Sequence, residues 1–321
     1  MKKIFLLVSI AIMLVLSCGN EGKNSSEAGG GKSKESFKIG ITQIVAHPAL
    51  DSAREGFKDA FKEAGLKVVF DEKNANGEIA TANMIANNFI TEKVDMIYAI
   101  ATSTAQAAAQ STDKIPVVFS AITDPEAAGI LKKNVTGISD RVNVKQQLEL
   151  LLKLDSKIKK VGVIYNSSEQ NSKVQVDDLK KAASELGITI VEKSVTQVSE
   201  IPQASETLVK ESDALYLPTD NLVASVVNLI TEKAIKAKKI AFGAESAHVK
   251  GGALITQGID YYEMGKEAGK IAVDILKNGK SPSEITFKKM DLNDIVINNK
   301  TLAAIGISLP EDIKSKAKTI D

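Results

Sequence analysis

The sequence is poor in the residues on which disulfides, metal centres and most nucleophilic catalysis depend. Its 321 residues include one cysteine, Cys18, so neither an intrachain disulfide nor a zinc site built from several thiolates can form. Only two histidines, His47 and His248, are available as general bases. The G-x-S-x-G, Walker A and H-E-x-x-H motifs are absent. We therefore expect no enzyme, no metal site and no cofactor.

Aromatic residues and excess charge are also scarce. The chain has no tryptophan, aromatic residues make up 4% of it, and 41 Lys and Arg offset 40 Asp and Glu, leaving a net charge of +1. Proteins that bind nucleic acids usually carry a basic face or aromatic platforms for the bases. No nucleic-acid partner is expected. A length of 321 residues with 44% hydrophobic residues allows two globular domains of ordinary size.

The first residues resemble an export signal that ends in a lipid-attachment site. Lys2 and Lys3 precede an apolar run, Ile4 to Leu16, which is shorter than the roughly 20 residues that a membrane-spanning helix needs. The run ends in Val15-Leu16-Ser17-Cys18, which resembles the bacterial lipobox. We expect a signal peptide over residues 1–17 and a lipidated Cys18 that holds the protein on the extracytoplasmic side of the cell membrane. The alternative is an ordinary signal peptide that happens to end in cysteine.

The next segment is a candidate tether. Residues 19–36 consist mainly of Gly, Ser, Lys, Glu and Asn, and Ala28 is their only aliphatic residue. Such a composition cannot bury enough apolar surface to fold. We expect a flexible tether over 18–36 and a globular body that starts near Phe37.

From Phe37 onward, short β-branched runs alternate with amphipathic helical stretches such as Ala49–Ala64. This alternation is typical of parallel sheets covered by helices on both faces, an α/β fold. The predicted strands are Lys38–Ile44, Lys67–Phe70, Val94–Ile100, Ile115–Ser120, Lys160–Tyr165, Thr189–Glu192, Ala214–Leu217 and Ile240–Gly243.

The two halves of this pattern repeat each other. Lys38-Ile39-Gly40-Ile41 matches Lys160-Val161-Gly162-Val163, which lies 122 positions later (160 − 38). Gly65 and Gly187 end the following helices at the same offset (187 − 65 = 122), and both are expected in the left-handed conformation of a helix C-cap. We therefore predict two doubly wound parallel-sheet lobes.

The remaining segments are expected to cross back between the lobes as a multi-stranded hinge. We assign residues 37–140 and about 257–283 to the first lobe, and residues 141–256 and about 284–321 to the second. The predicted elements are a strand over Gly251–Gly258, a helix over Tyr261–Lys277 capped by Gly279, a strand near Ile285–Met290 and a helix near Pro310–Lys318.

Polar loops follow the predicted strands in both halves, where open α/β sheets bind their ligands. Hydroxyls and free amides at helix starts suit a carboxylate, and a buried carboxylate suits an ammonium group, so we expect a zwitterionic ligand. Asp220 is our first choice for the ammonium, with Asp124 and Glu245 as alternatives. The same residues could serve only as helix caps. The candidate ligand-binding residues are Gln43, His47, Thr102, Ser103, Thr104, Ser120, Thr123, Asp124, Asn166, Ser167, Ser168, Asp220, Asn221 and Glu245.

Other candidate residues divide between cleft and core. Tyr165, Tyr261 and Tyr262 could reach the cleft because they lie at a strand end or a crossover. Tyr98 and Tyr216 lie inside strands, where we expect core positions, and His248 is expected to be structural.

Several of these loops carry longer motifs. They include Gly40-Ile41-Thr42-Gln43 with His47-Pro48-Ala49-Leu50-Asp51, Pro116 to Pro125 (PVVFSAITDP), Tyr165-Asn166-Ser167-Ser168-Glu169, Pro218-Thr219-Asp220-Asn221 and Gly258-Ile259-Asp260-Tyr261-Tyr262. Together they resemble the ABC-transporter substrate-binding proteins of the tryptophan/tyrosine type, over nearly everything after residue 37. The resemblance implies a type I periplasmic-binding-protein fold, an amino acid ligand with aromatic ones favoured, and delivery to a permease with its ATPase. Ser103 departs from the Pro expected in many relatives.

Two other functions remain open at this point. The same fold could serve as a ligand-sensing lobe pair for a membrane signalling protein, because docking faces carry no readable motif. A two-lobed α/β enzyme is a third hypothesis, and the absence of the catalytic motifs named above disfavours it.

Overall fold

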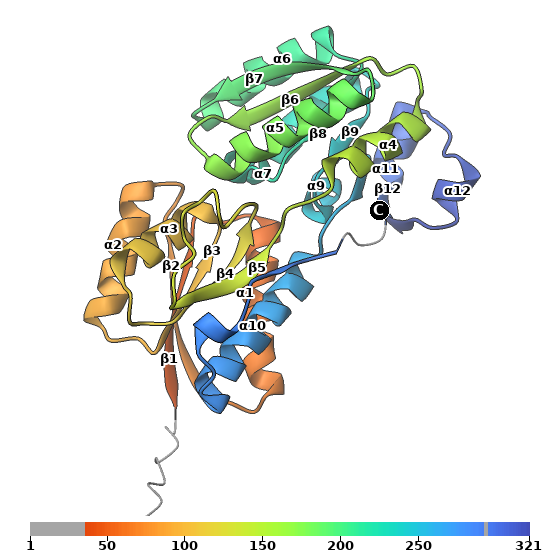
Figure 1. Cartoon of the computed structure of the whole chain (residues 1–321). Coiled ribbons are helices and arrows are strands. Elements are labelled where there is room, and N and C mark those ends of the chain that lie inside the picture. Colours follow the sequence, from red (N-terminus) through yellow and green to blue (C-terminus); the bar gives the residue numbers. More distant parts are fainter. Residues whose placement is uncertain (1–35, 292–294) are drawn as a thin grey trace, which may run out of the picture. The chain divides into compact units, whose positions relative to one another are not determined.

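The computed structural model describes residues 36–291 and 295–321 (Figure 1). The predicted signal peptide, Cys18 and the tether lie outside these residues. Within the described ranges, no helix combines the length and the apolar character that crossing a bilayer requires.

The first lobe is built on a six-stranded sheet whose strands all pair in parallel. Its middle strands are buried on both faces, as their continuous apolar sequences require. In spatial order the strands are β11 (Lys288–Lys289), β5 (Val135–Ser139), β4 (Val117–Ile122), β3 (Met96–Ile100), β1 (Phe37–Gln43) and β2 (Val68–Asn74).

The second lobe repeats this order and adds two strands at one edge. β12 runs antiparallel to β10, while the other neighbours are parallel. The order is β13 (Lys318–Ile320), β12 (Ile295–Asn298), β10 (Ile255–Gln257), β9 (Ala241–Gly243), β8 (Ala214–Leu217), β6 (Lys160–Asn166) and β7 (Thr189–Val195). Since β5-β4-β3-β1-β2 corresponds to β10-β9-β8-β6-β7, the predicted pair of doubly wound parallel-sheet lobes is confirmed.

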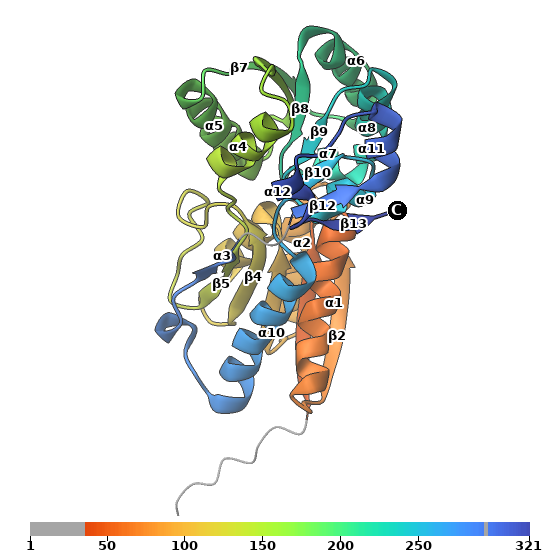
Figure 2. The ribbon, with the colours of Figure 1, turned by 90° about the vertical axis from the view of Figure 1, so that its right-hand side faces the viewer.

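Helices cover both sheets (Figures 1 and 2). Those of the first lobe are α1 (Pro48–Glu63), α2 (Ile79–Thr91), α3 (Thr102–Ser111), α10 (Tyr261–Asn278) and the 3-10 turn η2 (Pro282–Glu284). Those of the second lobe are α4 (Val144–Leu154), α5 (Gln170–Glu185), η1 (Val198–Glu200), α6 (Ile201–Glu211), α7 (Asn221–Ser225), α8 (Val227–Lys236), α9 (Ser246–Lys250), α11 (Asn299–Ile305) and α12 (Glu311–Lys314).

Glycines end the helices where the sequence predicted them. Gly65, Gly187 and Gly279 have φ values of 65°, 68° and 69°, the left-handed region in which a side chain would be strained. The matched positions of Gly65 and Gly187 confirm that the two lobes share one βα design.

Helix α10 lies against α1 although about 200 residues separate them in the chain (Figure 2). Glycines allow this close approach. A Cβ atom added at Gly265 would lie 2.0 Å from the carbonyl oxygen of Ala53, and one at Gly56 would lie 2.1 Å from that of Tyr262. The first lobe is therefore completed by a helix that follows the second lobe in sequence.

The chain passes three times between the two sheets: from β5 to α4, from β10 to α10 and from β11 to β12. The sequence pattern predicts the last crossing at about residue 284. The structure places it after Lys289, because Lys288 and Lys289 pair with Ile138 and Ser139 of the first sheet.

Three elements near the hinge are shorter than predicted. The strand expected over Gly251–Gly258 is confined to Ile255–Gln257, since Gly251 and Gly252 form a turn in which Gly252 has φ 99°. The strand expected near Ile285–Met290 is only Lys288–Lys289. The helix expected near Pro310–Lys318 spans Glu311–Lys314, and Lys318–Ile320 joins the edge of the second sheet instead.

Candidate functional site

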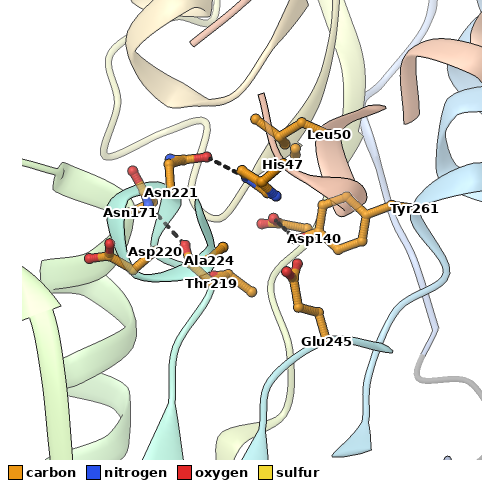
Figure 3. A pocket seen from close by; sticks show the side chains of 11 residues that line it. His47, Leu50, Asp140, Asn171, Thr219, Asp220, Asn221, Ala224, Glu245 and Tyr261 are labelled. Atoms are coloured by element: carbon orange, nitrogen blue, oxygen red, sulfur yellow. Dashed lines mark hydrogen bonds between the residues drawn. The ribbon is translucent and has the colours of Figure 1, made fainter. Parts of the chain in front are cut away.

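The carboxyl ends of the strands in the two lobes face a common cavity (Figure 3). Its volume is about 10 Å³, enough for a single water molecule. We call it the inner cavity. It is lined by His47, Leu50, Ala121, Asp140, Asn171, Thr219, Asp220, Asn221, Ala224, Glu245 and Tyr261. No Lys or Arg is among these described lining residues, whereas three of them are carboxylic acids.

His47 immediately precedes helix α1 and reaches the other lobe. Its Nε2 lies 3.4 Å from Oδ1 of Asn221, the first residue of α7 (Figure 3). Burial lowers the pKa of His47 to about 4, so the imidazole is neutral at pH 7. The other ring nitrogen, Nδ1, is buried and has no hydrogen-bond partner in the described part of the chain.

Asp220 is fully buried, and both oxygens of its carboxylate accept hydrogen bonds from residues of the second lobe. Oδ1 accepts the backbone N–H of Val223 at 2.8 Å and so caps α7. Oδ2 accepts the N–H of Asn166 at 2.5 Å and the hydroxyl of Ser172 at 2.7 Å. Burial, followed by the nearby Glu169, raises the pKa of Asp220. With three protein donors, Asp220 is poorly placed for the ammonium role that we first gave it.

Glu245 has the opposite surroundings. It follows β9 at the start of α9, it is 2% exposed, and its Oε1 has no hydrogen-bond partner among residues 36–291 and 295–321. Nε2 of His248 lies 3.3 Å from that oxygen, but the two atoms are not aligned for a hydrogen bond. Burial raises the pKa of Glu245 to about 8 and lowers that of His248 to about 3. Glu245 is thus a buried carboxyl group with an unused oxygen beside the cavity.

Asp140 and Tyr261 complete this wall of the cavity. The hydroxyl of Tyr261, the first residue of α10, donates to Oδ2 of Asp140 at 2.7 Å. Thr123 donates to the other oxygen at 3.0 Å. Burial raises the pKa of Asp140 despite these two donors. Tyr261 therefore belongs to the site, as its position at a crossover suggested.

A second, larger cavity lies next to the first and shares Asn221 with it. We call it the outer cavity; its volume is about 300 Å³. Aliphatic side chains of both lobes contribute to its wall: Ile44, Val45 and Ile79 from the first, and Val198 and Leu222 from the second. The remaining lining residues are Asn76, Gly77, Glu78, Ser103, Asn166, Ser168, Glu169, Thr196, Gln197, Asn221 and Ser225.

Seven of the fourteen predicted ligand-binding residues line one of the two cavities. His47, Asp220, Asn221 and Glu245 line the inner cavity, and Ser103, Asn166, Ser168 and again Asn221 line the outer one. These residues come from both lobes, as the duplicated strand pattern predicted.

The other seven predicted residues line neither cavity: Gln43, Thr102, Thr104, Ser120, Thr123, Asp124 and Ser167. Local bonds account for most of them. Ser120 is a core residue bonded to the hydroxyl of Tyr98 at 2.6 Å, and Thr104 donates to the carbonyl of Ile100 at 2.7 Å. Asp124 forms an ion pair with Arg141 at 2.8 Å.

Three more of these seven residues form hydrogen bonds within the protein. Gln43 donates to Asp51 at 2.8 Å, and Thr123 supports Asp140. The backbone N–H of Ser167 donates to the carbonyl of Val195.

Two alanines in strained conformations lie at the carboxyl ends of strands in the first sheet. Ala101, before α3, has φ 85°, and Ala121, at the end of β4, has φ 57°. Such strain in residues other than glycine costs about 1–3 kcal/mol and is concentrated at functional sites. The start of α3 has no side-chain cap, and the buried Oγ1 of Thr102 finds no partner among the described residues.

The candidate residues chosen from the sequence did not include six that line the inner cavity: Leu50, Ala121, Asp140, Asn171, Thr219 and Ala224. Asn171 donates to the carbonyl of Thr219 at 3.0 Å and so joins two loops of the second lobe. Asp140 follows β5, a strand that we did not predict, which explains why it was missed. The motif that contains Thr219 was the available signal for that residue.

Tyr98 and Tyr216 are fully buried core residues, as predicted, and His248 is buried as well. Tyr165 and Tyr262 do not reach the inner cavity; their hydroxyls donate to Glu192 and Asp59. In the part of the chain that the structure describes, no group of three or more His, Cys, Asp or Glu side chains is placed to hold a metal ion.

Two similar lobes enclosing a polar cavity fit a protein that closes on a small solute. Residues 38–320 match the family model of ABC transporter substrate binding proteins. The chain belongs to this family. Its two-lobed arrangement is that of type I periplasmic binding proteins, and a member of this family binds its solute rather than converting it.

Individual relatives are similar over almost the whole chain. A tyrosine-binding protein of Clostridioides difficile (strain R20291) is 40% identical over 319 residues, which is 95% of this chain and 92% of the relative. A Streptococcus pneumoniae structure in complex with L-Trp is 33% identical, with a TM-score of 0.85 over 89% of this chain and 100% of that one. The ligand-free, open structure of a Clostridium difficile substrate-binding protein with adhesive properties is 43% identical, with a TM-score of 0.68 over 89% and 99%.

Proposed function

We propose that this substrate-binding protein captures an aromatic amino acid between its lobes and delivers it to an ABC permease and its ATPase. Lipidation at Cys18 would hold it on the extracytoplasmic face of the membrane. The observation that carries the ligand assignment is the inner cavity, to which both lobes contribute, where three of the lining residues are carboxylic acids and the described lining includes no Lys or Arg. A tyrosine-binding relative and a tryptophan-bound relative support the aromatic class.

The α-ammonium group of the ligand belongs in the inner cavity. A cationic group is the natural partner of buried carboxylates, and Glu245 offers an oxygen that no described donor uses. Asp220 instead holds the loops of the second lobe together. We therefore move the ammonium role from Asp220 to Glu245.

The rest of the ligand belongs toward the outer cavity. The uncapped start of α3, with Ser103 in the outer wall and the unpartnered hydroxyl of Thr102 beside it, suits the carboxylate. The aliphatic side chains of the outer cavity suit an aromatic ring, and a volume of about 300 Å³ lies within the usual range for small-molecule sites.

Such a ligand can enter only when the lobes separate, because the inner cavity has room for one water molecule. The chain superposes better on the tryptophan complex than on the ligand-free open structure, with TM-scores of 0.85 and 0.68, although it is more identical in sequence to the latter. This supports hinge closure over the ligand as the binding mechanism.

A thermal-shift screen of the common amino acids, followed by calorimetry of the hits, tests the proposed function. We expect L-tyrosine or L-tryptophan to raise the melting temperature, since a ligand that binds only the folded form at 100 times its Kd stabilises it by about 2.7 kcal/mol. A screen in which neither changes the transition would contradict the aromatic assignment. Stimulation of a reconstituted permease and ATPase by the loaded protein tests delivery.

A further inference from the structure

The wall of the inner cavity near Glu245 contains two buried carboxylic acids, and no described cationic side chain pairs with them. Glu245 and Asp140 are 2% and 3% exposed, and the hydroxyl of Tyr261 donates to Asp140. Arg141 is the next residue in the chain, but its guanidinium is bonded to Asp124 and Asp178.

The groups that face Glu245 from the surrounding elements do not supply the missing charge either. These groups are His248 from α9, Tyr261 from α10, Asp140 from the end of β5, His47 from the start of α1 and Asp220 from the start of α7. Both histidines are buried and neutral at pH 7, the tyrosine is protonated, and Asp140 and Asp220 are acids.

Like charges in a water-poor site cannot all ionise, so at least one carboxyl group of this wall carries a proton while the cavity holds no cation. Hydrogen-bond donors decide which one. Asp140 accepts from Thr123 and Tyr261, and Asp220 accepts from three donors, all of which favour the ionised form. Oε1 of Glu245 has no described donor, so we expect Glu245 to be the acid that holds the proton. Burial raises the pKa of all three acids, that of Asp220 to about 7 and that of Glu245 to about 8, so the carboxyl group of Glu245 ionises after that of Asp220.

We propose that Glu245 selects ligands with a cationic amino group and that this group displaces a proton from Glu245 as it enters the inner cavity. The inference rests on the proposed function, because it assumes an amino acid ligand. The step is an exchange: the O–H bond of the Glu245 carboxyl group breaks, its proton goes to solvent, and the carboxylate pairs with the R–NH₃⁺ group.

Two consequences distinguish this exchange from binding to a carboxylate that is already ionised. First, affinity rises with pH between about 6 and 8, by up to about tenfold per pH unit, because deprotonation of Glu245 is part of the binding reaction. Secondly, an analogue without the amino group, such as 3-(4-hydroxyphenyl)propanoate, binds far more weakly than L-tyrosine and releases no proton from this site.

Isothermal titration calorimetry of the full chain with L-tyrosine and L-tryptophan tests the inference. Titrations at pH 7 in phosphate, HEPES and Tris, which differ in ionisation enthalpy, give the number of protons released. We expect about 0.5–1 proton per ligand, in line with a pKa near 8 in the free protein. A heat of binding that does not depend on the buffer, together with an affinity that stays constant from pH 6 to 8, would overturn the inference while leaving the proposed function intact.

Variants locate the proton. Glu245→Gln should abolish the release and weaken binding by at least about tenfold, whereas Glu185→Gln, an exposed residue paired with Lys145 on the surface, should release as many protons as the natural protein. Unchanged release from a folded Glu245→Gln protein would overturn the assignment to Glu245. Should that variant fail to fold, the pH profile of the natural protein decides. If neither amino acid binds at any pH, the proposed function fails, and this inference fails with it.

Discussion

His47 in the first lobe and Asn221 in the second face each other across 3.4 Å, Nε2 to Oδ1, next to the inner cavity. The contact joins the loop before α1 to the first turn of α7, two segments that belong to different sheets. Asn221 lines both cavities, so this pair lies at the boundary between the position proposed for the ammonium group and the position proposed for the ring.

His47→Leu should weaken ligand binding by roughly three- to tenfold, because it removes one interlobe hydrogen bond of about 0.5–1.5 kcal/mol. Leucine is similar in size to histidine, so the packing should change little. Calorimetry with the aromatic amino acid measures the change. Tyr262→Phe is the matched control, since it also removes one hydrogen bond, to Asp59 on the surface of α1. Equal affinities for the two variants would remove His47 from the binding site.

Asp220→Asn should destabilise the folded protein by roughly 1–3 kcal/mol. The two carboxylate oxygens of Asp220 accept hydrogen bonds from three donors, whereas the amide of asparagine has only one acceptor oxygen. The amide NH₂ group would face either the N–H of Val223 or the donors from Asn166 and Ser172. Chemical denaturation measures the loss.

Asp260→Asn is the matched control for Asp220→Asn. Asp260 caps α10 with one oxygen, Oδ1, which accepts from Tyr262 and Glu263. Asparagine can do the same, so this variant should lose less than about 0.5 kcal/mol. Similar losses in the two proteins would mean that Asp220 is no more than a helix cap.

Glu245→Gln should stabilise the protein without ligand, increasingly so from pH 5 to pH 8. The pKa of Glu245 is raised to about 8 in the folded state, so the unfolded chain loses this proton first and the natural protein becomes less stable as the pH rises through this window. Glutamine has no proton to lose, and we expect a gain of roughly 1–3 kcal/mol at pH 8. Denaturation curves at several pH values would contradict this if the difference between the proteins did not change with pH.

Val198→Trp should reduce the affinity for aromatic amino acids by more than about tenfold, since the new indole would fill part of the outer cavity. Val198 is 39% exposed, so the change should cost little stability. Val69→Trp, at a position that is 60% exposed on β2 and lines neither cavity, is the control. Similar affinities in the two variants would show that the ligand's ring lies elsewhere.

Cys18→Ala should move the protein from the membrane to the soluble fraction, because the thioether-linked lipid is the only membrane attachment that we propose. Fractionation after a high-salt wash, with immunoblotting, measures this. Cys18→Ala protein that remained in the membrane fraction would contradict the lipobox assignment.

Much of the fold was predictable because local chemistry and tertiary structure agree there. Gly65 and Gly187 are left-handed caps in both lobes, and the apolar runs around Ile97 and Leu215 became fully buried strands. The duplicated order of these signals was sufficient to predict two sheets of the same design.

The parts that were missed depend on partners that are far away in sequence. Lys318–Ile320, at the end of a predicted helix, forms a strand only because β12 offers an edge, so this segment has no strand pattern of its own. Likewise, Asp140 and Glu245 line one cavity from different lobes, and which of them keeps a free oxygen depends on Thr123 and Tyr261. The loops could be predicted from sequence, but the hydrogen-bond partners within them could not.

The packing of α10 on α1 also determines when the first lobe can fold during synthesis. The central strands β6 to β9 of the second lobe are contiguous in sequence, whereas the glycine contact between Gly265 and Ala53 forms only after α10 has left the ribosome. Until then the face of α1 that packs on α10, with Ala53, Gly56 and Ala60, has no covering helix. The lobe that is made first is therefore completed late. We expect a nascent chain that ends before Tyr261 to remain incompletely folded, the condition in which a polypeptide can still be threaded through a narrow translocation pore.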